Sequence, residues 1–146
     1  MQLFCPLRKK WVAALPEEKI RQALIKKMID SLDYPLHCLA LEKGLNQLPH
    51  LQFNSALPKR RADLIVFSRD AAPLLLIECK ATPLNNKVLR QLVGYNQFIG
   101  AHFIAAINQM KAILGHFDEK SKNYIFSEGL PSYPLLIEKA QNKNST

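Results

Sequence analysis

Leu74-Leu75-Leu76-Ile77-Glu78-Cys79-Lys80 is an aliphatic run that ends in a carboxylate, a thiol and an amine. Its aliphatic part is apolar on both faces, which predicts a central β-strand covered above and below. Because side chains two residues apart in a strand point the same way, Glu78 and Lys80 share one face, while Cys79 packs into the other. Burying two charged groups there is unfavourable unless they are paired or bind a metal. The run therefore predicts both a central strand and a site at its end.

The preceding extended run, Arg61–Phe67, has a similar composition. Asp63 stands near the start of a sequence that is otherwise apolar from Leu64 onward. Turn residues at Asp70–Pro73 separate this run from the next one. We therefore expect the two runs to be neighbouring strands, which would place Asp63 close to Glu78.

Two adjacent carboxylates repel each other unless a cation lies between them, and hard oxygen ligands suit Mg²⁺ or Mn²⁺. The sequence thus predicts a divalent-metal site formed by Asp63 and Glu78, with the backbone carbonyl of Cys79 as a further ligand. Lys80 would hold an attacking water and add positive charge. The alternative for these residues is a structural salt bridge of Asp63 or Glu78 with Lys80 or Arg61.

The order of expected elements predicts an α/β fold in which helices flank the sheet. At 146 residues the chain suits one domain, which we place at residues 1–140. Residues 1–15 are expected to form an arm or short hairpin, and residues 141–146 a flexible polar tail. The expected helices are Pro16 to about Asp33 and a segment that follows Asn85-Asn86; further extended runs are His37–Leu45, His102–Ile107, Tyr124–Phe126 and Leu135–Ile137.

The charge balance favours a polyanionic partner. The chain has 20 basic and 12 acidic residues, a formal net charge of +8, and nucleic acid is the first candidate. A solvated basic surface is the equally weighted alternative. The cysteine count of three, without metal-ligand spacing, indicates the reducing cytoplasm, and no run is long and apolar enough for a membrane span.

Two basic clusters are candidate phosphate contacts. Lys59, Arg60 and Arg61 directly precede the Asp63 strand, near the expected site. The second cluster, in the N-terminal arm, is Arg8, Lys9 and Lys10. A solvated turn is the alternative for the first cluster. Beside the second, Trp11 either stacks on a base or, as lone tryptophans more often do, fastens the arm to the core.

The ordered set Asp63, Glu78-x-Lys80 and Gln91-Leu92-Val93-Gly94-Tyr95 resembles the PD-(D/E)xK nuclease superfamily, and its last part is similar to the QxxxY motif of the RecB-like branch. More narrowly, Pro6–Val12, Pro16–Gln22 and Lys59–Asp63 resemble the family related to the N-terminal nuclease region of type I restriction enzyme motor subunits. The resemblance implies a restriction-endonuclease-like core with a mixed central β-sheet flanked by helices.

The resemblance also implies Mg²⁺-dependent cleavage of DNA. Asp63 and Glu78 would be the metal ligands and Lys80 the catalytic lysine. Glu18 would be the helix carboxylate that faces the site, and first-turn dipole capping is the alternative for it. Gln91 and Tyr95, one helical turn apart, would position Lys80 or a phosphate; an ordinary polar stripe is their alternative.

The sequence departs from the superfamily pattern where Ala62-Asp63 replaces the proline-aspartate pair. It also has no P-loop, so we do not expect it to move along DNA unaided. Expected partners are DNA and either a second copy of the chain or a larger restriction or repair complex. The competing hypothesis is a catalytically silent module that keeps the fold and binds nucleic acid or another protein.

Overall fold

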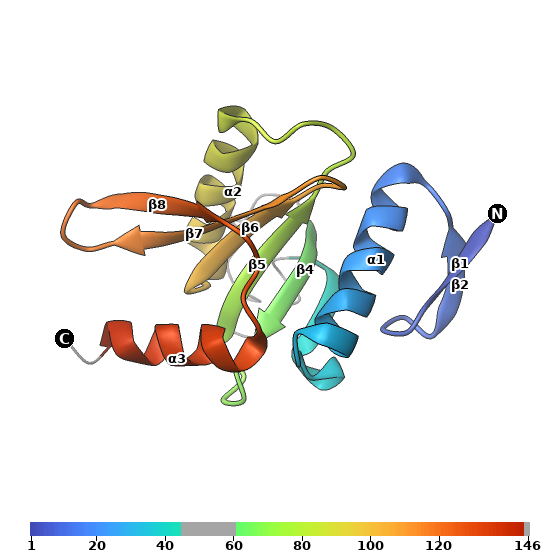
Figure 1. Cartoon of the computed structure of the whole chain (residues 1–146), viewed down its shortest axis with the longest axis horizontal. Helices are drawn as coiled ribbons and strands as arrows, with labels where there is room; N and C mark the ends of the chain where they lie inside the picture. Colours follow the sequence, from blue (N-terminus) through green and yellow to red (C-terminus); the bar gives the residue numbers. More distant parts are fainter. Residues whose placement is uncertain (45–60, 145–146) are drawn as a thin grey trace.

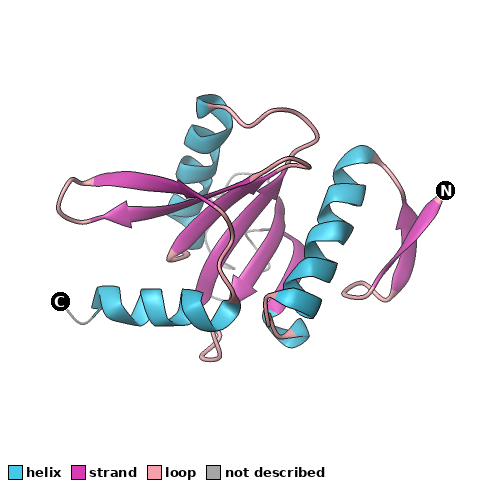
Figure 2. Cartoon of the chain, viewed as in Figure 1, coloured by secondary structure: helices cyan, strands magenta, loops and turns pink. Residues whose placement is uncertain are grey.

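The computed structural model describes residues 1–44 and 61–144, and a six-stranded mixed β-sheet organises this part of the chain (Figure 1, Figure 2). The strands lie in chain order: β3 (Leu39–Gly44), β4 (Arg61–Phe67), β5 (Pro73–Cys79), β6 (Phe103–Ile107), β7 (Ala112–Asp118) and β8 (Asn123–Glu128). Strands β5 and β6 pair in parallel, whereas the other neighbours pair antiparallel. The predicted α/β fold with a mixed central sheet is confirmed.

The centre of the sheet is the parallel pair β5 and β6. Residues Leu74–Ile77 are at most 1% exposed, and every residue of β6 is buried. A parallel pair needs a crossover connection, and helix α2 (Asn86–Ile99) supplies it. Asn85 begins that helix by accepting a hydrogen bond from the backbone N–H of Val88 at 3.0 Å. The aliphatic run is thus the predicted central strand.

Helices cover both faces of the sheet. Leu75 and Ile77 pack into a cluster with Met28 of helix α1 (Pro16–Ser31) and Leu136 of helix α3 (Tyr133–Asn144). Residues of α2, Ile99 among them, pack against the opposite face in a second cluster. This split follows from the alternation of side chains along a strand. No helix within residues 1–44 and 61–144 is long and apolar enough to cross a membrane.

Helix α1 lies between the sheet and an N-terminal hairpin (Figure 1). Proline at its first position and the carboxylates of Glu17 and Glu18 in its first turn favour a helix start there. Its buried residues are Glu18, Arg21, Leu24, Ile25 and Met28. The hairpin pairs β1 (Gln2–Cys5) with β2 (Lys10–Ala13). The arm expected at residues 1–15 is therefore a two-stranded hairpin.

The C-terminal part differs from the sequence prediction. Leu135–Ile137, expected as an extended run, lies within α3, and the tail expected from Gln141 is helical through Asn144. A short apolar run does not distinguish a strand from a helix. The helical conformation buries Tyr133 and Leu136, which are 2% and 0% exposed, and this burial stabilises the helix.

Two further features of the sheet differ from the sequence prediction: the start of β3 and the presence of β7. The extended run expected from His37 begins with the 3₁₀ turn Leu36–Cys38 before β3. Strand β7 was not predicted, because Gly115 and His116 interrupt its apolar alternation. The hydrogen-bonded pairing of β7 with β6 and β8 compensates for this weak local pattern.

Candidate active site

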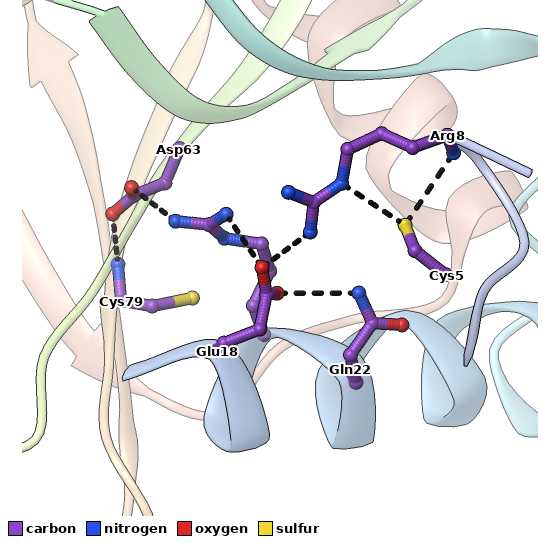
Figure 3. A network of polar contacts seen from close by, with 7 residues as sticks. Cys5, Arg8, Glu18, Gln22, Asp63 and Cys79 are labelled. Atoms are coloured by element: carbon purple, nitrogen blue, oxygen red, sulfur yellow. Dashed lines mark hydrogen bonds and ion pairs between the residues drawn. The ribbon is translucent and has the colours of Figure 1, made fainter. Parts of the chain in front are cut away.

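Glu18 is a buried carboxylate in the first turn of α1, 9% exposed. Its Oε1 accepts hydrogen bonds from Arg8 and from Nη1 of Arg21, the latter at 3.4 Å. Its Oε2 accepts one from Nε2 of Gln22 at 3.2 Å (Figure 3). Arg21 and Gln22 follow Glu18 by three and four residues, so the three side chains share one helix face. Glu18 therefore forms specific side-chain hydrogen bonds in addition to any interaction with the helix dipole.

Arg21 links Glu18 to the sheet. It is 8% exposed, and its Nη2 donates to Oδ1 of Asp63 on β4 at 2.9 Å. The other Asp63 oxygen, Oδ2, accepts the backbone N–H of Cys79 at 2.8 Å (Figure 3). One guanidinium thus joins a carboxylate of α1 to a carboxylate of β4, and we call these three residues the Glu18–Arg21–Asp63 network.

Asp63 and Glu78 occupy neighbouring positions on β4 and β5. The recorded register of the two strands ends where Leu64 lies opposite Ile77, one residue before Asp63 on β4 and one before Glu78 on β5. Beyond that pair, Oδ2 of Asp63 accepts the backbone N–H of Cys79 at 2.8 Å. The structure confirms that the two runs are adjacent strands and that their acidic residues lie at matching ends.

Glu78 and Lys80 form an ion pair at the end of β5. Nζ of Lys80 lies 3.4 Å from Oε1 of Glu78, and the two side chains are 27% and 12% exposed. The backbone N–H of Lys80 donates to the carbonyl of Ile107 on β6 at 2.9 Å. This bond extends the parallel pairing past β5, so the lysine is positioned by the sheet itself.

Cys79 contributes its backbone to the site, while its side chain is buried. The side chain is 0% exposed. Burial, followed by the nearby charge of Asp63, raises the pKa of the Cys79 thiol to about 12, although Arg21 acts in the opposite direction. The thiol therefore stays protonated at neutral pH.

The N-terminal hairpin reaches the same region through Arg8. The buried Sγ of Cys5 accepts hydrogen bonds from the backbone N and from Nε of Arg8, at 3.4 and 3.3 Å. Burial acts to raise the pKa of the Cys5 thiol, but these bonds and one from Gln22 outweigh it and lower the pKa. Arg8 in turn donates to Glu18. The hairpin is thus connected to the Glu18–Arg21–Asp63 network (Figure 3).

The remaining predicted residues lie in several environments. Gln91 is exposed on α2. Tyr95, one turn later, is 4% exposed and belongs to the hydrophobic cluster between α2 and the sheet. Their positioning of Lys80 or a phosphate stays a prediction. Lys59 and Arg60 lie outside the described residues, and Arg61 begins β4.

In the hairpin, Arg8 is engaged with Glu18 and Cys5, whereas Lys9 and Lys10 are exposed. The interpretation of Trp11 as an anchor to the core is wrong, because its side chain is 63% exposed. It packs instead against Phe4 of the same hairpin.

Arg21 is the site residue that was not among those predicted from the sequence. The available signal was a basic residue three positions after Glu18, on the helix face that also carries Leu24 and Ile25. A basic side chain at a buried position needs a counter-charge. The sequence provides no means of recognising Asp63, 42 positions away, as that partner.

The donor set fits a hard divalent cation. Within the described ranges, no group of three or more histidine, cysteine, aspartate or glutamate side chains is arranged to hold a metal. Mg²⁺, however, is commonly held by one or two carboxylates, with waters and substrate phosphate completing its shell. Asp63 and Glu78 supply such carboxylates. Each Asp63 oxygen accepts a hydrogen bond, from Arg21 or from the backbone N–H of Cys79, and has a second lone pair.

A cleft of about 680 Å³ adjoins the end of β5 at Ala81 and runs between α1 and the turn after β6. Three of its lining side chains are basic: Lys19, Lys27 and Lys111. Asp63, Glu78 and Lys80 do not line this cleft, but its three lysines suit a ligand with a phosphate backbone.

One known family matches most of the chain. The family described as Type I restriction enzyme R protein N terminus matches residues 16–131, more than three quarters of the chain. The chain belongs to this family. The matched segment contains α1 and strands β3 to β8, and with them Glu18, Arg21, Asp63, Glu78 and Lys80. No curated protein matches the chain.

Proposed function

We propose that the chain is a PD-(D/E)xK nuclease that uses a divalent metal to hydrolyse phosphodiester bonds in DNA, in a restriction-related role. The observation that supports the proposal is that Asp63 of β4 accepts a hydrogen bond from the backbone N–H of Cys79, the residue between the ion-paired Glu78 and Lys80 at the end of β5. Membership of the Type I restriction enzyme R protein N terminus family supports the role. The basic cleft beside Ala81 supports a phosphate-bearing substrate.

The residues of the site have distinct roles in this proposal. Asp63 and Glu78 hold Mg²⁺ or Mn²⁺ together with the carbonyl of Cys79. The bound ion supplies Lewis acidity and a more acidic water. Lys80, oriented by Glu78 at 3.4 Å, holds the attacking water and offsets negative charge that develops on the phosphate. Lys80 is the residue whose removal tests the chemistry most directly.

Arg21 and Glu18 are positioning residues here. Arg21 holds the Asp63 carboxylate while no dication does, and its positive charge offsets the negative charges of the buried Glu18 and the partly buried Asp63. With a dication bound to Asp63, Glu18 would remain as a partner for the same guanidinium. Gln22 and Arg8 in turn hold Glu18, so its carboxylate keeps one orientation.

The test is DNA cleavage with a lysine variant. Purified full-length chain is incubated with plasmid and with single-stranded DNA, in Mg²⁺, in Mn²⁺ and in EDTA. We expect cleavage that needs the dication and falls by about 10²-fold or more in Lys80→Ala. Lys122→Ala is the matched control, because Lys122 also pairs with a carboxylate, Glu119, but is 74% exposed. Absence of cleavage, or equal cleavage by Lys80→Ala, would contradict the proposal.

A second candidate function is a binding module that keeps the fold without catalysis. The observation that favours it is the engagement of both Asp63 oxygens by Arg21 and by the N–H of Cys79, which is a complete structural role for that carboxylate. The two candidates differ in whether the native state binds a dication. A module of this kind binds DNA without gaining stability from Mn²⁺.

A further inference from the structure

The N-terminal hairpin carries an exposed aromatic pair. Phe4 and Trp11 lie opposite each other in the β1–β2 register, with ring centroids 5.5 Å apart and an interplanar angle of 71°. Their side chains are 50% and 63% exposed. Because opposite positions share a face, both rings lie on the same side of the hairpin. We call this side the Phe4–Trp11 face.

The other side of the hairpin packs on the body of the molecule. Cys5, next to Phe4, is fully buried and anchors Arg8, which reaches Glu18. An isolated two-stranded hairpin is only marginally stable in water, so these inward contacts hold it in place. The Phe4–Trp11 face is therefore not what attaches the hairpin, and its large rings remain open to solvent.

The charged residues of the hairpin segment itself are all basic. Residues 1–15 contain Arg8, Lys9 and Lys10 and no acidic residue. Lys9 lies in the turn with a positive φ of 55°, and both Lys9 and Lys10 are exposed. Aromatic rings beside lysines are the combination that binds single-stranded nucleic acid: bases stack on the rings, and the lysines contact the phosphates. A duplex does not offer free base faces.

We propose that the Phe4–Trp11 face binds unpaired bases of single-stranded nucleic acid, with Lys9 of the adjoining turn contacting its phosphates. The hairpin lies outside the segment that matches the R protein family, which begins at residue 16. Binding on this face does not depend on the metal site. Only the consequence that such a strand is a substrate rests on the proposed nuclease function.

Trp11 is the only tryptophan in the chain, so its fluorescence reports directly on this face. The full-length chain is titrated in EDTA, where the metal site is inactive, with an oligo-dT strand. A strand of equal length without bases and a duplex with the same number of phosphates serve as comparison ligands. We expect oligo-dT to quench the tryptophan and to bind more tightly than both.

Variants separate stacking from charge. Binding of a labelled oligo-dT, measured by fluorescence anisotropy, should weaken by about tenfold in Trp11→Ala and in Phe4→Ala. Trp11→Phe keeps an aromatic ring and should retain most of the affinity. Phe117→Ala is the matched control, since Phe117 is a 39% exposed aromatic residue on β7. This variant should bind oligo-dT as tightly as the parent chain does. Thermal unfolding of each variant checks that it is folded.

Two results would overturn the inference. Equal affinity for the strand without bases, together with unchanged binding by Trp11→Ala, would mean that only phosphates are contacted. Concentration-dependent self-association that Trp11→Ala abolishes, without preference for oligo-dT, would mean that a second copy covers the face. Failure of DNA cleavage leaves this test intact, because every measurement is made without a dication.

Discussion

Arg21 is the single residue on which the electrostatics of the site depend most. It is 8% exposed and contacts the carboxylates of Glu18 at 3.4 Å and Asp63 at 2.9 Å. Buried carboxylates without a counter-charge are strongly destabilising, because their lost hydration is not replaced. Arg8 also contacts Glu18, so Asp63 is the carboxylate that relies more heavily on Arg21.

Replacing Arg21 should therefore destabilise the fold. We expect Arg21→Met to lower the free energy of unfolding by about 3 kcal/mol, measured by urea denaturation. Arg21→Lys keeps the charge but loses the planar fork that bridges two partners, so its loss should be smaller. Lys122→Met, at an exposed ion pair, should change stability by less than about 1 kcal/mol. An equally small effect of Arg21→Met would show that the carboxylates do not need this partner.

At the scale of elements, the β7–β8 hairpin depends on a close approach that only glycine permits. A Cβ atom added to Gly115 of β7 would lie 2.6 Å from a ring carbon of Phe126 on β8 and 3.1 Å from Cγ1 of Ile104 on β6. One of these side chains must move to make room. Gly94 of α2 provides the contrast, because an added Cβ there has nothing within 4 Å.

Substitution of the two glycines by alanine should change the free energy of unfolding in opposite directions. We expect Gly115→Ala to lower the free energy of unfolding by about 1–3 kcal/mol through overpacking. Gly94→Ala, at an open helical position, should raise it by up to about 1 kcal/mol, since alanine favours the helix. Chemical denaturation of both variants checks this. Equal effects at the two positions would contradict the packing described around Phe126.

At the scale of the whole molecule, binding of a dication to the site would appear as a change in global stability. A ligand that binds only the native state stabilises it by about 2.7 kcal/mol at a free concentration of 100 Kd. Asp63 and Glu78 come from different strands, so the unfolded chain has no such site. The melting temperature therefore reports on the proposed metal centre without any assay of cleavage.

We expect Mn²⁺ to raise the melting temperature of the parent chain by about 5 °C or more near saturation. Asp63→Asn should abolish that rise. The comparison is between melting with and without Mn²⁺ for each protein, because the substitution also weakens the bond with Arg21. Asp118→Asn, at a carboxylate of the distant β7–β8 turn, is the control. DNA binding with no Mn²⁺-dependent shift in the parent would favour the silent module.

Local patterns in the chain were sufficient to predict the main elements. The aliphatic run Leu74–Ile77 predicted the buried central strand, and Pro16 followed by two glutamates predicted the start of α1. The antiparallel pairing of β4 with β5 followed from two apolar runs separated by a short turn. Alternation and helix-start chemistry act between residues close in sequence, and such signals can be recognised without a structure.

Other features were decided by contacts between distant parts of the chain. Arg21 meets Asp63 across 42 positions, α3 forms where Tyr133 and Leu136 are buried, and Trp11 remains exposed. Helical spacing placed Glu18 and Arg21 on one face, but it carried no information about which strand that face would meet. The sequence thus determined most of the elements and the adjacency of β4 and β5. The tertiary fold alone selected the partners of the buried charges, because burial and the distance between remote groups exist only after the layers have packed.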